Sequence, residues 1–515
     1  MHVHKKLLPT TSRLLFLLVV VKITAQPNNV KRNLKATPMS KSINELGTIK
    51  GAQSIRVRYN TGSIFDILSG RYVLGAKGEM ILNGGISGFN GFCAAPNMFK
   101  SVLMHMGGVC LVQNYTESTY VPFECESSGE MARIRETSKY IAPEIYAMDE
   151  DTFLEHPNIV MTDLSQYTGT EFWDMVSKIY KNRVDNIAKF TRDTPMVGKD
   201  GTRMKAKVPI HFSIDSFSAM RTEQQENMQD ENDIGTSGQN MVVMRGGMGK
   251  TQLLMEIPTM VARAGMIFST TAHMGEKFSL DPYAPKINKL NFLSTSIKLK
   301  FVPEQFTYLP NNLWWIMGAA PMYKPKSKNP EYPLDGRAES ENDTDLMLLT
   351  MTNLRGKSGP SGMPTELVVS QRDGFNPSLT YFRFIKEWGE KGEIGFGLNG
   401  SRDWWELDLY PGTKLSRTTV RGLIDRDPKL RAAIHFTGDL CFMHERWHNL
   451  DRSLLCTPAE LYNDLKEKGY DWDRLLATRP IWRFDQYEHP VPFLSTMDLL
   501  RMRIGSYRPY WYDEK

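Results

Sequence analysis

One stretch of the sequence has the residue types of a phosphate-binding loop. An apolar segment, Gly91–Ala95, is followed by a short loop and then by Lys100 and Ser101, which begin a helical pattern. Backbone N–H groups at a helix start attract phosphate, a lysine neutralises it, and a hydroxyl is a ligand for Mg²⁺. Ala94 and Phe99 stand where the usual pattern has glycines. The residues that we predict to bind a nucleotide are Ala95, Pro96, Asn97, Met98, Phe99, Lys100 and Ser101.

A second lysine-containing stretch competes with the first. Gly246–Thr251 (GGMGKT) follows the apolar run Met241–Met244 and has the Gly-Lys-Thr ending, but it lacks the first glycine of the usual pattern. It comes late in the chain, where too little sheet remains to complete a nucleotide site. We therefore predict that it starts the helix before the next strand, and that Lys250 is not needed for nucleotide hydrolysis.

Polar residues end three further apolar runs. Glu124 and Glu126 follow the first, Asp215 ends the second, and His273 follows the third. The carboxyl ends of parallel strands meet in one crevice, so we expect these side chains to face the loop before Lys100. A carboxylate at such a position is suited to hold Mg²⁺ near a phosphate.

The stretch HERWH matches a zinc-binding pattern. On a helix it would bring His444 and His448 to one face, with Glu445 as a base. Arg446 departs from the uncharged centre usual in zinc hydrolases, and Glu467 is the third ligand that the spacing offers. An ordinary amphipathic helix is the favoured interpretation, and an exported zinc hydrolase is the outside alternative.

The candidate residues need an α/β framework to bring them together. From Gly75 onward, short apolar runs alternate with helical patterns, which predicts a mainly parallel twisted sheet with flanking helices. The expected strands are Gly91–Ala95, Tyr120–Phe123, Asn158–Thr162, Val208–Ile214 and Gly265–Thr271.

Three regions are expected along the 515 residues. Residues 1–65 form a basic N-terminal arm, residues 66–390 a core with an insertion at about 322–345, and residues 391–515 a small α/β C-terminal region. The run Leu14–Val21 is too short to span a bilayer. We favour a segment that docks on a neighbouring subunit over an export signal at 1–25, and we expect a cytoplasmic protein.

Charge and cysteine content exclude several classes of protein. The net charge is +5, yet the first 60 residues hold eleven Lys or Arg and one acid, Glu45, so the remainder is mildly acidic. A uniformly basic nucleic-acid coat is therefore excluded. Five cysteines without a CxxC pair indicate neither a disulfide scaffold nor a zinc ribbon, and they fit a reducing compartment.

The order of the motifs resembles the RecA recombinase superfamily, most closely its phage UvsX-type members, in which the phosphate loop also ends in Phe-Lys-Ser. The similar stretches are LNGGISGFNGFCAAPNMFKS (82–101), ECES (124–127), FSIDSFSAM (212–220) and FSTTAH (268–273). The likeness covers roughly residues 70–435, and it implies a RecA-like P-loop NTPase core.

The resemblance also implies roles for single residues. Lys100 would contact the β- and γ-phosphates of ATP, and Ser101 and Asp215 would hold Mg²⁺. Glu126 would orient or deprotonate the attacking water, and His273 would sense the γ-phosphate.

In this superfamily the segment after the sensing residue is a mobile DNA-binding loop. The corresponding segment here, 274–300, has five lysines and two acids with interleaved aromatics, which suits single-stranded nucleic acid. The residues expected to contact DNA are Lys277, Phe278, Tyr283, Lys286 and Lys289.

The implied function is a DNA-dependent ATPase that binds single- and double-stranded DNA and promotes strand exchange in recombination and repair. It would assemble with copies of itself as a filament or ring, without a membrane partner. Two alternatives stay open at this point: a RecA-type replicative helicase motor, and an assembling NTPase-fold protein with weak hydrolysis.

Overall fold

The computed structural model describes residues 56–125, 131–160, 162–163, 168–221, 223, 227, 238–276, 290–294, 296–334, 342–357, 359–389 and 393–513. The chain divides into two units, 1–52 and 53–515, and all described residues belong to the second.

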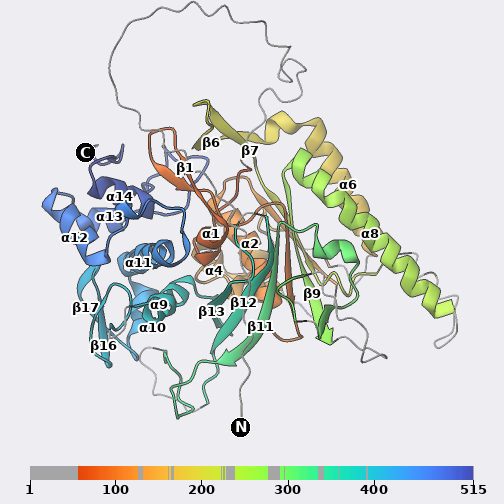
Figure 1. Ribbon diagram of the computed structural model, residues 1–515. Coiled ribbons are helices and arrows are strands. Elements are labelled where there is room, and N and C mark those ends of the chain that lie inside the picture. Colours follow the sequence, from red (N-terminus) through yellow and green to blue (C-terminus); the bar gives the residue numbers. More distant parts are fainter. Residues whose placement is uncertain are drawn as a thin grey trace, which may run out of the picture. The chain divides into compact units, whose positions relative to one another are not determined.

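A ten-stranded sheet forms the centre of this unit (Figure 1). In the order in which they lie side by side, its strands are β14 (Gly374–Phe375), β13 (Pro364–Ser370), β12 (Leu346–Gly356), β11 (Asn312–Pro321), β3 (Phe89–Ala94), β9 (Met266–Glu276), β8 (Ile210–Asp215), β4 (Thr119–Glu124) and β5 (Thr162–Asp163), and β10 (Ile297–Leu299) pairs with β9. The strands from β11 to β5 are parallel. The other pairings are antiparallel.

Side chains of β3 alternate between two hydrophobic clusters, as the period of two in a strand requires. Phe92 and Ala94 belong to one cluster, and Phe89 and Cys93 belong to the other. The central strands are therefore buried on both faces, which is typical of a parallel sheet covered by crossover helices. This confirms the predicted α/β class with a mainly parallel sheet.

Three long helices follow strands of the sheet and cover its faces. They are α2 (Lys100–Asn114), α6 (Gly169–Asp185) and α8 (Gly238–Ala264). Apolar residues of α2 such as Leu103 pack in the cluster with Phe92. Those of α6 and α8, such as Phe172 and Leu254, pack in the cluster with Phe89, and the two helices run side by side in Figure 1.

Shorter elements surround this core. The helices are α1 (Ile64–Ser69), α3 (Met131–Glu136), α4 (Pro143–Tyr146) and α5 (Glu150–Leu154), with 3₁₀ turns η3 (Ile187–Phe190) and η4 (Glu304–Thr307). Two hairpins, β1–β2 (Tyr72–Leu74, Met80–Leu82) and β6–β7 (Thr191–Val197, Arg203–Lys207), lie outside the main sheet.

The C-terminal region packs on the α2 side of the sheet. Its elements are α9 (Pro377–Glu387), β15 (Leu398–Gly400), β16 (Trp404–Leu407), β17 (Tyr410–Ser416), α10 (Val420–Arg426), α11 (Pro428–Arg446), η5 (Arg452–Leu454), α12 (Pro458–Glu467), α13 (Trp472–Leu476) and α14 (Thr496–Arg503). Buried residues of this region, including Leu430 and Leu500, belong to the same cluster as Phe92 of β3. The core of the predicted 66–390 region and residues 391–515 therefore share one continuous hydrophobic interior.

Four of the five predicted strands coincide with β3, β4, β8 and β9 within a few residues. The fifth, Asn158–Thr162, is reduced to an isolated bridge between Ile159 and Tyr120 and to β5, which begins at Thr162. None of the helices in the described parts of the chain has the length and apolar character needed to cross a bilayer.

Candidate functional site

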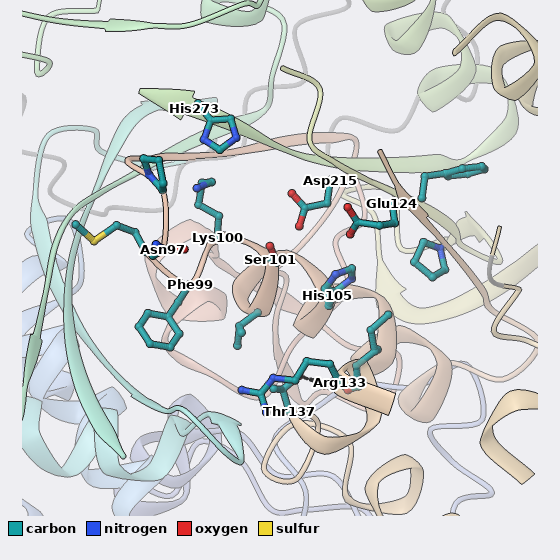
Figure 2. Close-up of a pocket in the computed structure, with 16 residues that line it drawn as sticks. Asn97, Phe99, Lys100, Ser101, His105, Glu124, Arg133, Thr137, Asp215 and His273 are labelled. Atoms are coloured by element: carbon teal, nitrogen blue, oxygen red, sulfur yellow. Dashed lines mark hydrogen bonds between the residues drawn. The ribbon is translucent and has the colours of Figure 1, made fainter. Parts of the chain in front are cut away.

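A pocket of about 360 Å³ opens at the carboxyl ends of β3, β4, β8 and β9 (Figure 2). Four residues predicted from three separate motifs line it: Lys100, Ser101, Asp215 and His273. The predicted loop residues Pro96, Asn97, Met98 and Phe99 also line it, whereas Ala95 does not belong to the lining. The sheet thus brings the loop and the three strand ends together, as the motif order predicts.

The loop between β3 and α2 lines the pocket and has an unusual backbone conformation. Asn97 and Phe99 have φ angles of 59° and 57°, in the left-handed region that few residues other than glycine adopt. Phe99 immediately precedes α2, and its side chain does not cap the first turn. An uncapped helix start attracts anions. The loop therefore has at Phe99 the backbone conformation that the missing glycine would permit.

Lys100 begins α2 and is almost fully buried. Its Nζ atom donates a hydrogen bond of 2.9 Å to the carbonyl oxygen of Ala95, which holds the ammonium group over the loop. Figure 2 shows Lys100, Asp215 and Glu124 extending into the same space. A cation is thus held opposite two carboxylates across the pocket.

Two carboxylates come from neighbouring parallel strands. Glu124 of β4 and Asp215 of β8 lie opposite each other in the strand register, at the carboxyl end of each strand. The Oγ1 atom of Thr271 donates a hydrogen bond of 2.5 Å to Oδ1 of Asp215. Asp215 is 7% exposed. Its carboxylate is thereby oriented from the neighbouring strand β9.

His273 lies opposite Ala94 in the pairing of β9 with β3, so the sheet register sets it beside the loop. Its backbone N–H donates to Oγ of Ser218 at 3.1 Å. The same hydroxyl donates to the carbonyl oxygen of Lys300 at 3.1 Å, and the N–H of Lys300 donates to the carbonyl oxygen of His273 at 2.9 Å. These bonds connect the pocket to the start of the segment after β10.

His105 is a pocket residue that the sequence reasoning missed. Its Nδ1 atom is 2.5 Å from the hydroxyl of Tyr120, which is 2.8 Å from Oγ of Ser213. Burial lowers the pKa of His105, and the negative charge of Asp215 opposes this shift. The available signal was the spacing of four residues from Ser101, which sets both side chains on one face of α2.

Arg133 and Thr137 line the pocket away from Asp215 (Figure 2). Arg133 forms an ion pair of 3.3 Å with Glu136 and also donates to the carbonyl oxygen of Gln371. Nothing in the sequence around α3 marks these residues as site residues, because their contribution depends on how α3 folds back after β4.

Several predicted residues lie outside the described part of the chain. Glu126, the predicted base, follows the last described residue of this segment, Cys125. The same is true of all five residues expected to contact DNA: Lys277, Phe278, Tyr283, Lys286 and Lys289. Glu124, which the sequence reasoning noted but did not assign, is the described carboxylate of β4 in the pocket.

The prediction that Gly246–Thr251 starts a helix is wrong, because α8 begins at Gly238 and these residues lie within it. Apolar residues such as Leu254 and Ile257 pack α8 onto the sheet, and this burial outweighs the low helix propensity of glycine. Lys250 Nζ donates to the carbonyl oxygens of Ser218 at 3.0 Å and Phe301 at 3.4 Å. Burial lowers the pKa of Lys250 to about 8.

The HERWH stretch does not form a helical zinc motif. Helix α11 ends at Arg446, so His448 lies beyond it and does not share a helix face with His444. Nε2 of His444 lies 3.1 Å from the carbonyl oxygen of Cys456. Within the described residues, no group of three or more His, Cys, Asp or Glu side chains is arranged to hold a metal ion.

The pocket combines a buried cation, uncapped helix N–H groups, a hydroxyl and two strand-end carboxylates. This set can bind a polyphosphate and neutralise its charge, and it can orient a water molecule next to it. No protein-family model matches this chain, and no curated protein matches it in sequence.

Proposed function

We propose that this protein is a Mg²⁺-dependent ATPase of RecA type that binds DNA and promotes homologous pairing and strand exchange. The observation that carries the ATPase assignment is the convergence of Lys100, Ser101, Asp215 and His273 on one pocket. Phosphoryl transfer depends on positioning and charge neutralisation more than on covalent chemistry, and this set is suited to both. The DNA part rests on the likeness of motif order and on the lysine-rich segment 274–300.

In the proposed reaction, the N–H groups at the start of α2 bind phosphate oxygens. Lys100 neutralises charge on the terminal phosphates, and its bond to Ala95 aims it there in advance. Pre-oriented charge in a pocket with little water stabilises a transition state more than the same charge does in water.

The residues fit a Mg²⁺ ion, because the Ser101 hydroxyl and the Asp215 carboxylate are oxygen ligands of the kind that Mg²⁺ takes. When bound, the ion would neutralise phosphate charge as the phosphoryl group is transferred. Thr271 holds the Asp215 carboxylate by the 2.5 Å hydrogen bond. The chain thereby fixes the direction of one ligand before any ion binds.

A carboxylate at the end of β4 orients the attacking water and accepts its proton. Glu126 is the residue that the resemblance assigns to this role, and Glu124 is a second candidate because it lines the pocket next to Asp215. The two residues differ by two positions, so separate glutamine variants assign the role.

The experiment is an ATPase assay of the full chain with and without single-stranded DNA. We expect ATP turnover that requires Mg²⁺ and that DNA stimulates. Lys100→Met should abolish this turnover, and Lys250→Met should retain it. Retention with Lys100→Met and loss with Lys250→Met would overturn the choice of loop. Strand unwinding without strand exchange would instead indicate a helicase motor. The absence of ATP turnover would contradict the ATPase assignment.

A further inference from the structure

Four cations lie at the amino ends of the parallel strands, at the edge of the sheet opposite the pocket. They are Arg56, Lys207, Arg355 and Lys357, here called the amino-edge cations. Lys207 ends β7 just before β8, and Arg355 and the residue after it end β12 beside the start of β11. Arg56 lies beside Gly88, just before β3, and β3 pairs with β11, so Arg56 and Lys357 lie close together although 301 positions separate them in sequence. Arg56 is also a charged neighbour of Lys207.

Arg56 and Lys357 meet beside the first residues of β3 and β11. A methyl group added at Gly88, just before β3, would lie 3.3 Å from a guanidinium nitrogen of Arg56 and 2.3 Å from Oδ1 of Asn311. The N–H of Lys357 donates to the carbonyl oxygen of Asn311 at 2.9 Å, and its Nζ donates to the carbonyl oxygen of Leu309 at 3.1 Å. Both cations are thus held at the same corner of the sheet.

Lys207 extends this surface towards the end of α8. Its Nζ donates to the carbonyl oxygen of Ala262 at 2.7 Å. Arg183, buried behind it, donates to the carbonyl oxygens of Ala264 and Val208. The lysine is therefore held in place by the last turn of the helix, not by a carboxylate.

The charges at this edge are not balanced within the described part of the chain. The charged neighbours that act on Lys357 are Arg355 and Arg56, and those that act on Lys207 are Arg183 and Arg56. Burial and these like charges lower the pKa of both lysines. An excess of positive charge at one surface favours the binding of an anion.

An open cleft of about 440 Å³ adjoins the amino-edge cations and adds aromatic surface. Arg355 and Lys357 line it together with Phe292 and Tyr308, which are 50% and 42% exposed. Of its described lining residues, Glu304 alone is acidic. Exposed rings beside cations suit unstacked bases beside phosphates, and they add little to the binding of an acidic peptide.

Two segments of this chain are poor occupants for the surface. The first 60 residues carry eleven basic residues and one acid, so they share its sign of charge. The acidic stretch within 221–240 precedes α8, whose 27 residues span about 40 Å and end beside Lys207. A separate anion fits the surface better than either segment.

We propose that the amino-edge cations, with Phe292 and Tyr308, bind single-stranded nucleic acid, phosphates on the cations and bases on the rings. This site shares Phe292 with the segment 274–300, its other residues lie outside that segment, and it does not use ATP. It goes beyond the proposed function, because a chain without ATPase activity would still bind through it.

The test measures binding of a labelled oligothymidylate by fluorescence anisotropy, with the full chain and without nucleotide. Arg56→Glu/Lys357→Glu should weaken binding at least tenfold and flatten the salt dependence by about 0.7 per lost phosphate contact. Tyr308→Ala should weaken it about tenfold through lost stacking. Lys328→Glu/Lys468→Glu, with the same change in net charge at exposed lysines elsewhere, is the matched control.

Three outcomes overturn the proposal. The first is wild-type affinity and salt slope in Arg56→Glu/Lys357→Glu, and the second is an equal loss in the control variant. The third is polyglutamate binding as tightly as oligothymidylate with no effect of Tyr308→Ala, which would indicate an acidic protein partner. Lys100→Met distinguishes this proposal from the ATPase assignment, because the variant should lose ATP turnover and still bind oligothymidylate.

Discussion

The two edges of the parallel sheet differ in their balance of charge. At the carboxyl edge, Lys100 faces Asp215 and Glu124 across a pocket. At the amino edge, Arg56 and Lys357 lie among other cations on an open surface. Balanced charge in a confined space suits a small reacting ligand, whereas unbalanced charge on an open surface suits a long anion. We infer that the sheet places the hydrolysis of ATP at one edge and the binding of nucleic acid at the other.

The variant with the largest expected effect acts on the carboxyl edge alone. Lys100→Met should lower ATP turnover by roughly 10³-fold, because it removes one pre-oriented charge from the transition state. Binding of oligothymidylate without nucleotide should stay unchanged. Phosphate release and anisotropy on the same preparation measure both. If the two activities fall together, the edges are not independent.

A second pair of variants identifies the base of the carboxyl edge. Glu124→Gln or Glu126→Gln should lower turnover by roughly 10²-fold, since an oriented carboxylate contributes about that much to proton transfer. The other variant should keep most of the activity and serves as the matched control. Equal activity in both variants would show that neither carboxylate takes the proton.

Salt should act on the amino edge much more than on the pocket. With four phosphate contacts, raising salt from about 50 to 200 mM should weaken binding of a single strand about 50-fold. Turnover at saturating ATP should change by less than about twofold, because buried charges are screened little. Parallel salt series of anisotropy and phosphate release test this. A binding curve that is flat with salt would contradict the amino-edge site.

Thr271→Val tests how Asp215 is oriented. It removes the hydroxyl that donates to Asp215 at 2.5 Å, and it should raise the Mg²⁺ concentration needed for half-maximal turnover about tenfold. Thr270→Val is the control, because its hydroxyl donates to the carbonyl oxygen of Ile214 and not to a carboxylate. An equal effect of both variants would indicate damage to β9 instead.

The smallest expected effect is a pH dependence of the amino edge. The pKa values of Lys207 and Lys357 are lowered, so these lysines lose their protons at a lower pH than ordinary lysines do. Raising the pH from about 7 to about 10 should therefore weaken single-strand binding by a few-fold. A parallel series with Lys357→Arg keeps the charge and should show a smaller decline. An equal loss of binding in both proteins would show that a group other than Lys357 causes the pH dependence.

Part of the carboxyl edge could be predicted from sequence, because several of its residues end or follow recognisable apolar runs. Lys100, Asp215 and His273 follow from that pattern and from the geometry of parallel strands. The start of helix α8 could not, since the glycines of Gly246–Thr251 indicate the beginning of a helix, whereas α8 begins at Gly238 and its packing on the sheet tolerates them.

The amino-edge cations had no sequence signal. Arg56 belongs to the predicted basic arm, whereas Lys207 and Lys357 belong to two distant segments, and nothing in the sequence indicates that the three residues meet. They meet because β3, β8 and β11 begin at the same edge, which is a result of topology. The same holds for Arg133, which reaches the pocket only because α3 folds back after β4.

The position of β9 between β3 and β8 fixes the distance between the two outer strands. Two interstrand spacings, about 10 Å in all, separate the strand that leads to Lys100 from the strand that ends at Asp215. The backbone thus sets this length, whichever rotamers the side chains adopt. Exchanging Lys100 or Asp215 for a residue with a longer or shorter side chain would change how far that side chain extends into the pocket. The distance between the two strands would stay the same, so the space left for a ligand would change.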